Sequence, residues 1–256
     1  MTEDEPVRDA VGADGKTEIR DITLGNAKPA DYSATDVTPA EDEPQSELRK
    51  RLEASAAPTR RRAILALARK DPDESVIEEL SERALSDPDD QVRQFALEAL
   101  GKLNGDPETA ISVLESETDP WVRAEAVVTL DRLARDDYES TFEELLESDA
   151  AGVRRNALIS LTRIREEAAR DVLLGALDDP SDRVKEWAVK LLGQYDDQAI
   201  KERLESVLED DSEVEIVRET AARSLGARGT DVGELLEERT GTASADEHML
   251  NQFPDG

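Results

Sequence analysis

The chain has 256 residues, with 62 acidic side chains against 32 basic ones and a net charge of −30 at pH 7. It has no cysteine and one histidine, which excludes disulfides, thiolate metal sites, cysteine nucleophiles and metal sites built on several histidines. The charge argues against binding to nucleic acid or to anionic membranes, because both are recognised by basic surfaces.

Targeting and membrane signals are missing from the sequence. No uncharged stretch approaches the roughly 20 residues that a spanning helix needs. The first residues, Met1 to Glu5, are acidic, unlike a signal or transit peptide. We therefore expect a soluble, cytoplasmic and monomeric protein.

The basic residues comprise 24 arginines and only 8 lysines. A dense carboxylate surface with few lysines resembles proteins of halophiles, whose cytoplasm holds molar salt. Salt at about 1 M shortens the Debye length to about 3 Å and screens the repulsion. We expect far-UV circular dichroism to show more helix and a higher melting temperature in molar KCl than in dilute buffer. Equal values in both solutions would contradict this prediction.

Residues 1–44 are predicted to form a disordered acidic N-terminal arm, because they are rich in acids and prolines and show no helical period. Within the arm, residues 18–25 alternate apolar and polar side chains like a short strand. Two interpretations stay open, namely a coil with three aliphatic side chains or a strip that lies along the folded body or a partner.

From residue 45 onward one pattern recurs six times, and its clearest copy runs from Gln91 to Leu100. Each copy places apolar residues on one stripe of a helix around a central alanine. The central alanines are Ala63, Ala96, Ala126, Ala157, Ala188 and Ala221. Their spacing of 30 to 33 residues indicates internal repeats.

A second helical pattern precedes five of the copies, at residues 75–85, 108–114, 141–146, 168–177 and 198–208. Asp-Pro pairs such as Asp119-Pro120 mark the turns, since Asp caps a helix and Pro suits its first position. Each repeat is thus a helix hairpin, which must stack on its neighbours to bury enough apolar surface. We predict an all-α solenoid over residues 45–239, with about six hairpins, a capping helix at 231–239, and a flexible tail at 240–256.

The residues from Asp87 to Leu100 read Asp-Pro-x-x-x-Val-Arg-x-x-Ala-x-x-Ala-Leu, which resembles HEAT repeats. The short period most resembles the phycobilisome-lyase-type (PBS lyase) HEAT-like repeat family. This resemblance implies an armadillo-like superhelix whose second helices line the concave surface. It says little about function, because one fold hosts many activities.

A basic residue stands three positions before each central alanine: Arg60, Arg93, Arg123, Arg154, Lys185 and Arg218. The resemblance to the HEAT family implies that these residues form a ladder of ion pairs with aspartates in the turns. The candidate aspartates are Asp90, Asp119, Asp149 and Asp182. A stripe that binds phosphates or acidic peptides is the alternative. The acids that alternate with the bases favour the structural ladder.

Positions opposite the core predict a partner surface. Leu65, Val128 and Ile159 stand there in place of charged residues, which predicts an apolar groove on the concave side. Scattered surface aliphatics are the alternative. The candidate partner-binding residues are Leu65, Ala124, Val128, Arg155, Ile159 and Trp121, whereas Trp187 is assigned to packing between repeats.

Three functions remain open. The first is a non-catalytic scaffold or adaptor that binds another protein. The second is an enzyme of the bilin lyase or isomerase type, or another HEAT-like lyase, and the third is a HEAT-like nucleic-acid module. We favour the first and predict no catalytic residue, metal or cofactor. Iron-dependent hydroxylases built of HEAT repeats use several His-Glu pairs, whereas this chain has only His248, after Glu247. The tail from Met249 to Phe253 is a further candidate docking motif.

Overall fold

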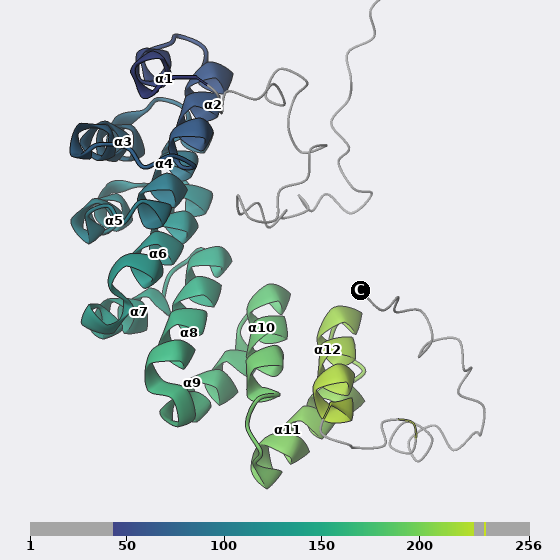
Figure 1. Cartoon of the computed structure of the whole chain (residues 1–256). Helices are drawn as coiled ribbons and strands as arrows, with labels where there is room; N and C mark the ends of the chain where they lie inside the picture. The colour runs from purple at the N-terminus through teal and green to yellow at the C-terminus, as the bar shows by residue number, and fades with distance from the viewer. Residues whose placement is uncertain (1–42, 228–232, 234–256) are drawn as a thin grey trace, which may run out of the picture.

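The computed structural model describes residues 43–227 and 233. Residues 1–42 of the predicted acidic arm, the flexible tail, His248 and all of the predicted capping helix except Gly233 lie outside these described residues. The described part is helical and forms a row of stacked hairpins, which confirms the predicted α-solenoid (Figure 1).

Six hairpins make up the described row, each consisting of an odd-numbered helix followed by an even-numbered one. The odd-numbered helices are α1 (Gln45–Leu52), α3 (Glu74–Ser86), α5 (Pro107–Ser116), α7 (Glu139–Leu145), α9 (Arg170–Gly175) and α11 (Gln198–Glu209). The even-numbered helices are α2 (Ala57–Leu67), α4 (Asp90–Lys102), α6 (Pro120–Ala134), α8 (Ala151–Arg165), α10 (Asp182–Leu192) and α12 (Glu215–Gly226).

Aspartates begin several of the helices, as the turn sequences predict. The side chain of Asp89 accepts a hydrogen bond from the Val92 N–H at the start of α4. Asp119 accepts from the N–H groups of Trp121 and Val122 at the start of α6, where Pro120 holds the first helical position. These bonds satisfy backbone donors that a helix cannot satisfy itself.

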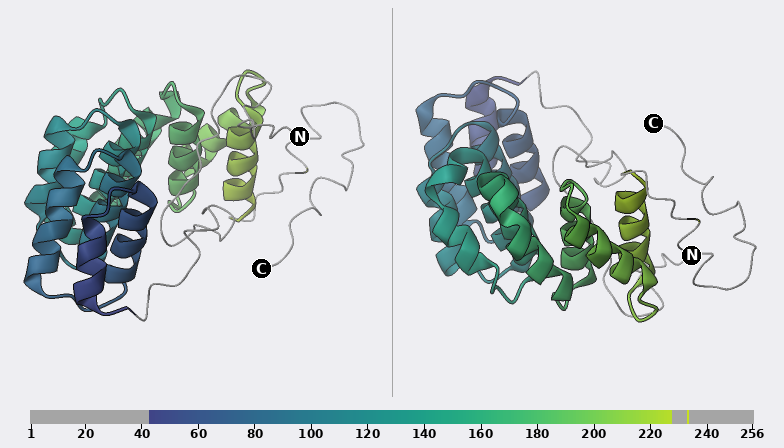
Figure 2. Two further views of the ribbon diagram at one scale, coloured as in Figure 1. Left: turned by 90° about the horizontal axis from the view of Figure 1, so that it is seen from above. Right: turned by 90° about the horizontal axis from the view of Figure 1, so that it is seen from below.

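The row bends so that the even-numbered helices form its inner side (Figures 1 and 2). Each even-numbered helix packs on the next along the whole row, from α2 to α12. Among the described odd-numbered helices, α3 and α5 make the largest direct contact, and it is smaller than any contact between successive even-numbered helices. We call the exposed side of the even-numbered helices the inner face.

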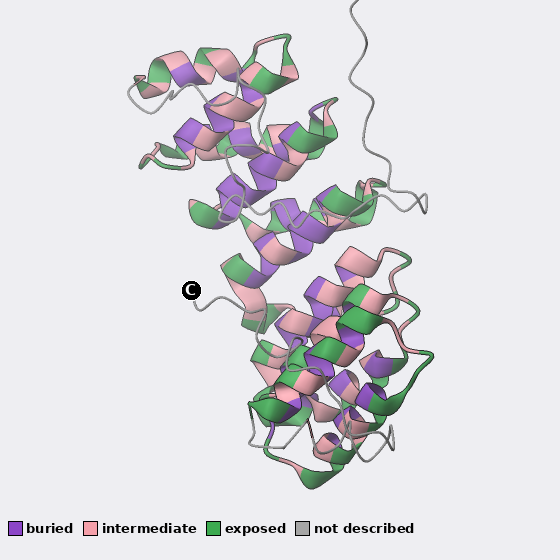
Figure 3. Cartoon of the chain, turned by 90° about the vertical axis from the view of Figure 1, so that its right-hand side faces the viewer, coloured by how far each residue is buried: buried purple, intermediate pink, exposed green. Residues whose placement is uncertain are grey.

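The central alanines lie at the contacts between helices. All six are fully buried, as predicted. Small side chains there let adjacent even-numbered helices approach closely. A Cβ atom added at Gly152 of α8 would lie 3.3 Å from the Cβ of Ala124 in α6. Figure 3 shows the buried stretches of the helices in purple.

The helix predicted at residues 168–177 is shorter in the structure. Only α9 is α-helical there, between 3₁₀ turns at Glu166–Ala169 and Ala176–Asp178. Helix α8 continues to Arg165 and ends at Glu166, whose φ of 46° lies in the left-handed region. The following helix therefore begins late.

Candidate functional site

Two features of the solenoid are candidates for function, namely the basic ladder at the turns and the inner face. The ladder is built from the basic column that the sequence predicts. Arg60 is almost fully buried and makes two bonds to the carboxylate of Asp87, from Nε at 2.7 Å and from Nη2 at 2.6 Å. Arg154 binds Asp179 in the same two-pronged way, at 2.8 and 2.7 Å. Such paired bonds fix the geometry between successive repeats.

The acidic partners differ from most of those predicted. The ladder cations pair with Asp87, Glu117, Asp179, Glu213, Asp182 and Asp211. Of the four predicted aspartates only Asp182 pairs with its ladder cation, Lys185, at 3.3 Å. Asp119 instead caps α6. The main partner acids stand earlier in the turn, where a side chain can reach back to the preceding repeat.

Arg123 is the exception in the basic column. It forms no ion pair within the described residues, and its buried Nε, like that of Arg218, has no hydrogen-bond partner. An acid stands six residues before three of the ladder cations: Asp87 before Arg93, Glu117 before Arg123, and Asp179 before Lys185. Each acid pairs with the cation of the preceding repeat. Before Arg154 this position is held by Ser148. The turn before Arg154 therefore has no carboxylate at this position, and neither Glu147 nor Asp149 beside it forms an ion pair with Arg123 in the described part of the chain.

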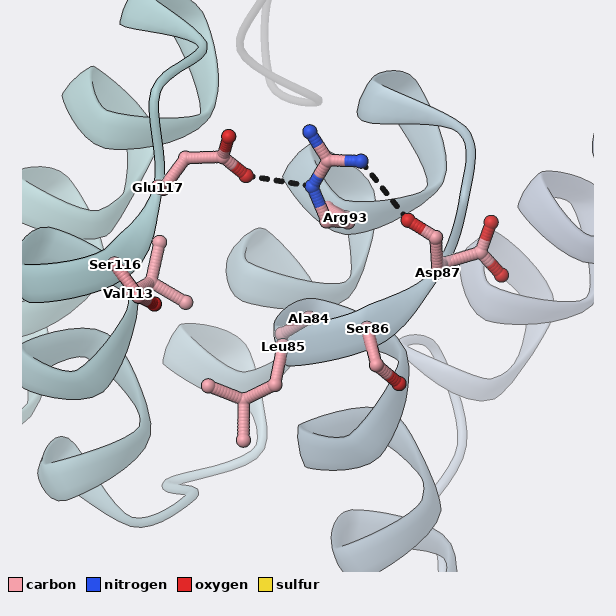
Figure 4. Close-up of a pocket in the computed structure, with 8 residues that line it drawn as sticks. All are labelled: Ala84, Leu85, Ser86, Asp87, Arg93, Val113, Ser116 and Glu117. Atoms are coloured by element: carbon pink, nitrogen blue, oxygen red, sulfur yellow. Dashed lines mark hydrogen bonds and ion pairs between the residues drawn. The ribbon is translucent and has the colours of Figure 1, made fainter.

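A cavity of about 220 Å³ lies beside the ladder, between the ends of α3 and α5 (Figure 4). Arg93 lies at its edge, with its Nε donating to Glu117 at 2.6 Å and its Nη1 donating to the Asp87 carbonyl at 2.9 Å. Leu85, which is 46% exposed, also lines this cavity. Because the charged groups in the cavity bind each other, we treat it as part of the ladder.

The inner face holds the predicted partner-binding residues, which are more covered than expected. Val128 and Ile159 are half-buried, and Ala124 is buried. Leu65 and Ile159 pack against the core, whereas Val128 is outside the core clusters found among the described residues. The close approach of α6 and α8 explains the cover.

The other two predicted residues lie in the first two turns of α6 and α8. Trp121 is 39% exposed in the first turn of α6, beside its capping Asp119. Arg155 is half-buried, and its Nε donates to the side-chain oxygen of Asn156 at 3.1 Å. Trp187 packs against the core as predicted, with the Lys190 ammonium 4.3 Å from its ring centre.

Two buried carboxyl groups interrupt the predicted apolar groove. Glu98 of α4 is 6% exposed and Glu125 of α6 is 5% exposed. Glu98 pairs with Lys102 at 3.2 Å. Burial and the neighbouring Glu98 charge raise the pKa of Glu125 to about 8, so this carboxyl group is mostly protonated at pH 7. Helical position alone did not reveal the pair, because its members come from different repeats.

Polar side chains also lie at the contact between α6 and α8. The Asn156 side chain donates to the Ala124 carbonyl at 2.9 Å, and the Arg163 guanidinium donates to Asp131 at 2.7 Å. Burial acts to raise the pKa of Asp131, but bonds from Arg135 and Ser160 hold it below its usual range. The inner face thus carries one protonated and one ionised buried carboxyl group on α6.

The described residues do not fit a metal centre. They contain no group of three or more His, Cys, Asp and Glu side chains that could hold a metal ion. The single histidine of the chain, His248, lies outside the described residues. No helix in the described part of the chain is both long and apolar enough to span a membrane.

A stack of helix hairpins tied by an arginine–carboxylate ladder defines an α-solenoid of HEAT type. The model of the HEAT repeats family matches residues 46–116, 107–192 and 174–248. These matches cover most of the chain, and the chain belongs to the HEAT-repeat family.

Individual relatives match less of the chain or match it less closely. Deoxyhypusine hydroxylase-B of Oryza sativa subsp. japonica is 43% identical over 86 residues, which cover 33% of this chain and 28% of the rice protein. The match thus spans less than a third of that relative's length.

Two solved structures show a looser similarity. The complex of CpcE and CpcF of phycocyanin lyase from Nostoc sp. PCC7120 has a TM-score of 0.42 at 17% identity, covering 76% of this chain and 82% of that one. Human deoxyhypusine hydroxylase in complex with glycerol has a TM-score of 0.34 at 20% identity, covering 78% and 79%. Both TM-scores are below 0.5.

The prediction that the chain is not an enzyme is contradicted by the rice relative, which is a hydroxylase. That prediction rested on the missing cysteine and on the single histidine. These absences exclude particular mechanisms, and they do not exclude catalysis by other side chains. The buried carboxyl groups of the inner face are residues of a type that can transfer protons.

Proposed function

We propose that this HEAT-repeat protein binds another protein along the inner face of α4, α6 and α8, and that the bound protein takes part in an enzymatic reaction. Val128 carries the binding proposal. It is a half-buried aliphatic side chain on an inner helix, yet it packs against neither core cluster. An apolar side chain in that position favours contact with a partner.

Charge defines the kind of partner. The chain has a net charge of −30 at pH 7, with 62 acidic side chains against 32 basic ones. Such a protein attracts basic partners and repels acidic ones. We therefore propose a partner segment that combines lysine or arginine with apolar side chains. The short repeat period resembles that of the phycobilisome-lyase-type repeats, and this resemblance supports a protein partner.

Replacing Val128 by glutamate tests the binding proposal. We expect Val128→Glu to abolish capture of the main partner, because an unpaired carboxylate would be buried in the interface. The melting temperature should change little, since Val128 is outside the core clusters. Affinity capture with mass spectrometry at native salt concentration measures the first effect, and circular dichroism measures the second.

Leu85→Glu is the matched control, because Leu85 is an exposed aliphatic residue on an odd-numbered helix. This variant should capture the same protein as the parent. Equal capture by Val128→Glu would exclude this inner-face site, and loss of folding would show that Val128 supports the core. Ile159 is less suitable for such a test because it packs against the core.

The enzymatic part rests on the rice relative and on Glu125, whose raised pKa suits a general acid at neutral pH. We expect incubation with the parent to change the mass of the captured protein. Glu125→Gln should capture the same protein and leave its mass unchanged, whereas Val128→Glu should lose capture itself. Modification that persists with Glu125→Gln would assign catalysis to other residues.

A further inference from the structure

The turn between α7 and α8 has the geometry of a ladder turn without its carboxylate. The Ser148 hydroxyl oxygen accepts a hydrogen bond from the Ala150 N–H at 3.3 Å. The carboxylates of Asp87 and Asp179 each accept from the N–H two residues further on, at 3.0 and 2.7 Å. The Ser148 hydroxyl therefore occupies the place that a carboxylate holds in the equivalent turns.

An arginine of the same repeat binds the backbone of Ser148, and the column position of Arg123 corresponds to this turn. Nη1 of Arg154 donates to the Ser148 carbonyl at 2.7 Å, as Nη1 of Arg93 donates to the Asp87 carbonyl. Arg123 holds the column position whose cation pairs with this turn in other repeats, and its buried Nε has no acceptor. A buried donor without an acceptor destabilises the fold, so an anion placed here would be stabilised.

We propose that Ser148 is a phosphorylation site whose phosphate pairs with Arg123 and completes the ladder. A protein kinase would transfer the γ-phosphoryl group of ATP, so that a bond forms between Ser148 Oγ and phosphorus. The bond from phosphorus to the bridging oxygen breaks, ADP leaves, and the hydroxyl proton is released. Phosphoserine carries a charge of about −1.5 to −2 at pH 7 and offers three acceptor oxygens.

The space required is consistent with the preceding repeat. Glu117 occupies the same turn position there, and it reaches Arg93 at 2.6 Å with a side chain longer than aspartate. A phosphoserine also extends further than aspartate. The new ion pair would tie the start of α6 to the turn before α8. It would therefore stiffen the helices that carry Val128 and Ile159, although the proposal does not depend on partner binding there.

The test uses the full chain with phosphoserine installed at position 148 by genetic code expansion. In the parent background we expect the melting temperature to rise by roughly 2–4 °C. The rise should vanish in Arg123→Gln and persist in part in Arg123→Lys, which keeps the charge. Phosphoserine at position 112 is the control. Ser112 is exposed on α5, and its hydroxyl donates to the Glu108 carbonyl.

Three results would overturn the proposal. One is an equal rise in the Arg123→Gln background, which would show that the phosphate does not act through this arginine. The second is an equal rise of the unmodified chain in inorganic phosphate, which would indicate a site for the free ion. The third is the absence of phosphate on Ser148 when the chain is isolated from its own cells and examined by mass spectrometry. Its presence there supports the proposal.

Discussion

Replacing Arg60 by alanine is expected to lower the free energy of unfolding by about 3 kcal/mol, because the change leaves the buried Asp87 carboxylate with only the longer ion pair to Arg83, at 3.7 Å. The Arg60 side chain is 7% exposed and that of Asp87 is fully buried. Arg60 also donates to the carbonyls of Ala54 and Ser55, at 2.9 and 3.0 Å. Urea unfolding followed by circular dichroism at constant salt measures the loss.

Arg123→Ala is the matched control for this prediction. Both arginines stand three residues before a central alanine, yet Arg123 has no carboxylate partner within the described residues. We expect its replacement to change the free energy of unfolding by less than about 1 kcal/mol. If both variants lose the same stability, the arginine side chains stabilise the solenoid by packing and the ion pairs contribute little.

The ladder shows how far sequence reasoning extends. The basic column could be read from the sequence, because it recurs at a fixed distance from the alanines. Asp87, Glu117 and Asp179 stand six residues before the next basic residue, whereas serines, Ser148 and Ser212, hold this position before Arg154 and Arg218. In the last repeat the neighbouring Glu213 pairs with Lys185 instead. Reading both columns together would have revealed the exceptional position of Arg123. Only the structure shows that the hydroxyl of Ser148 has the hydrogen bonding of a ladder carboxylate.

The inner face was harder to predict. A helical wheel places Glu98 and Val128 opposite the core, where both would be exposed on a single helix. Stacking brings the next helix against that side, so Glu98 is buried and Val128 is half-buried. The relative offset of neighbouring helices decides this cover. The boundary after α8 was also hidden, because no glycine or proline marks the turn at Glu166.

The second large effect concerns Glu125 and pH. Its pKa is about 8 in the folded chain and near 4.5 without burial, so between these values the folded state binds more protons than the unfolded state. The contribution of Glu125 to stability therefore falls as pH rises through this window, by up to about 1.4 kcal/mol per pH unit. Below about pH 4.5 the contribution is complete, and above about pH 8 it is lost.

Glu125→Gln removes this titration and keeps an amide of similar shape. Near pH 4.5 the variant should have the same free energy of unfolding as the parent as far as the charge is concerned. At pH 7 its free energy of unfolding should be higher by roughly 2–4 kcal/mol. Urea unfolding of both proteins at pH 5, 7 and 9 in constant salt measures the difference in their free energies of unfolding. Taking this difference cancels the titration of the many other acids.

Glu117→Gln is the control with the opposite sign. Burial acts to raise the pKa of Glu117, but bonds from Arg93 and from backbone N–H groups lower it, so its removal should destabilise the chain at pH 7. A difference between Glu125→Gln and the parent that stays constant from pH 5 to 9 would show that Glu125 does not change its protonation on folding. It would then be unsuited to act as the general acid of the inner face.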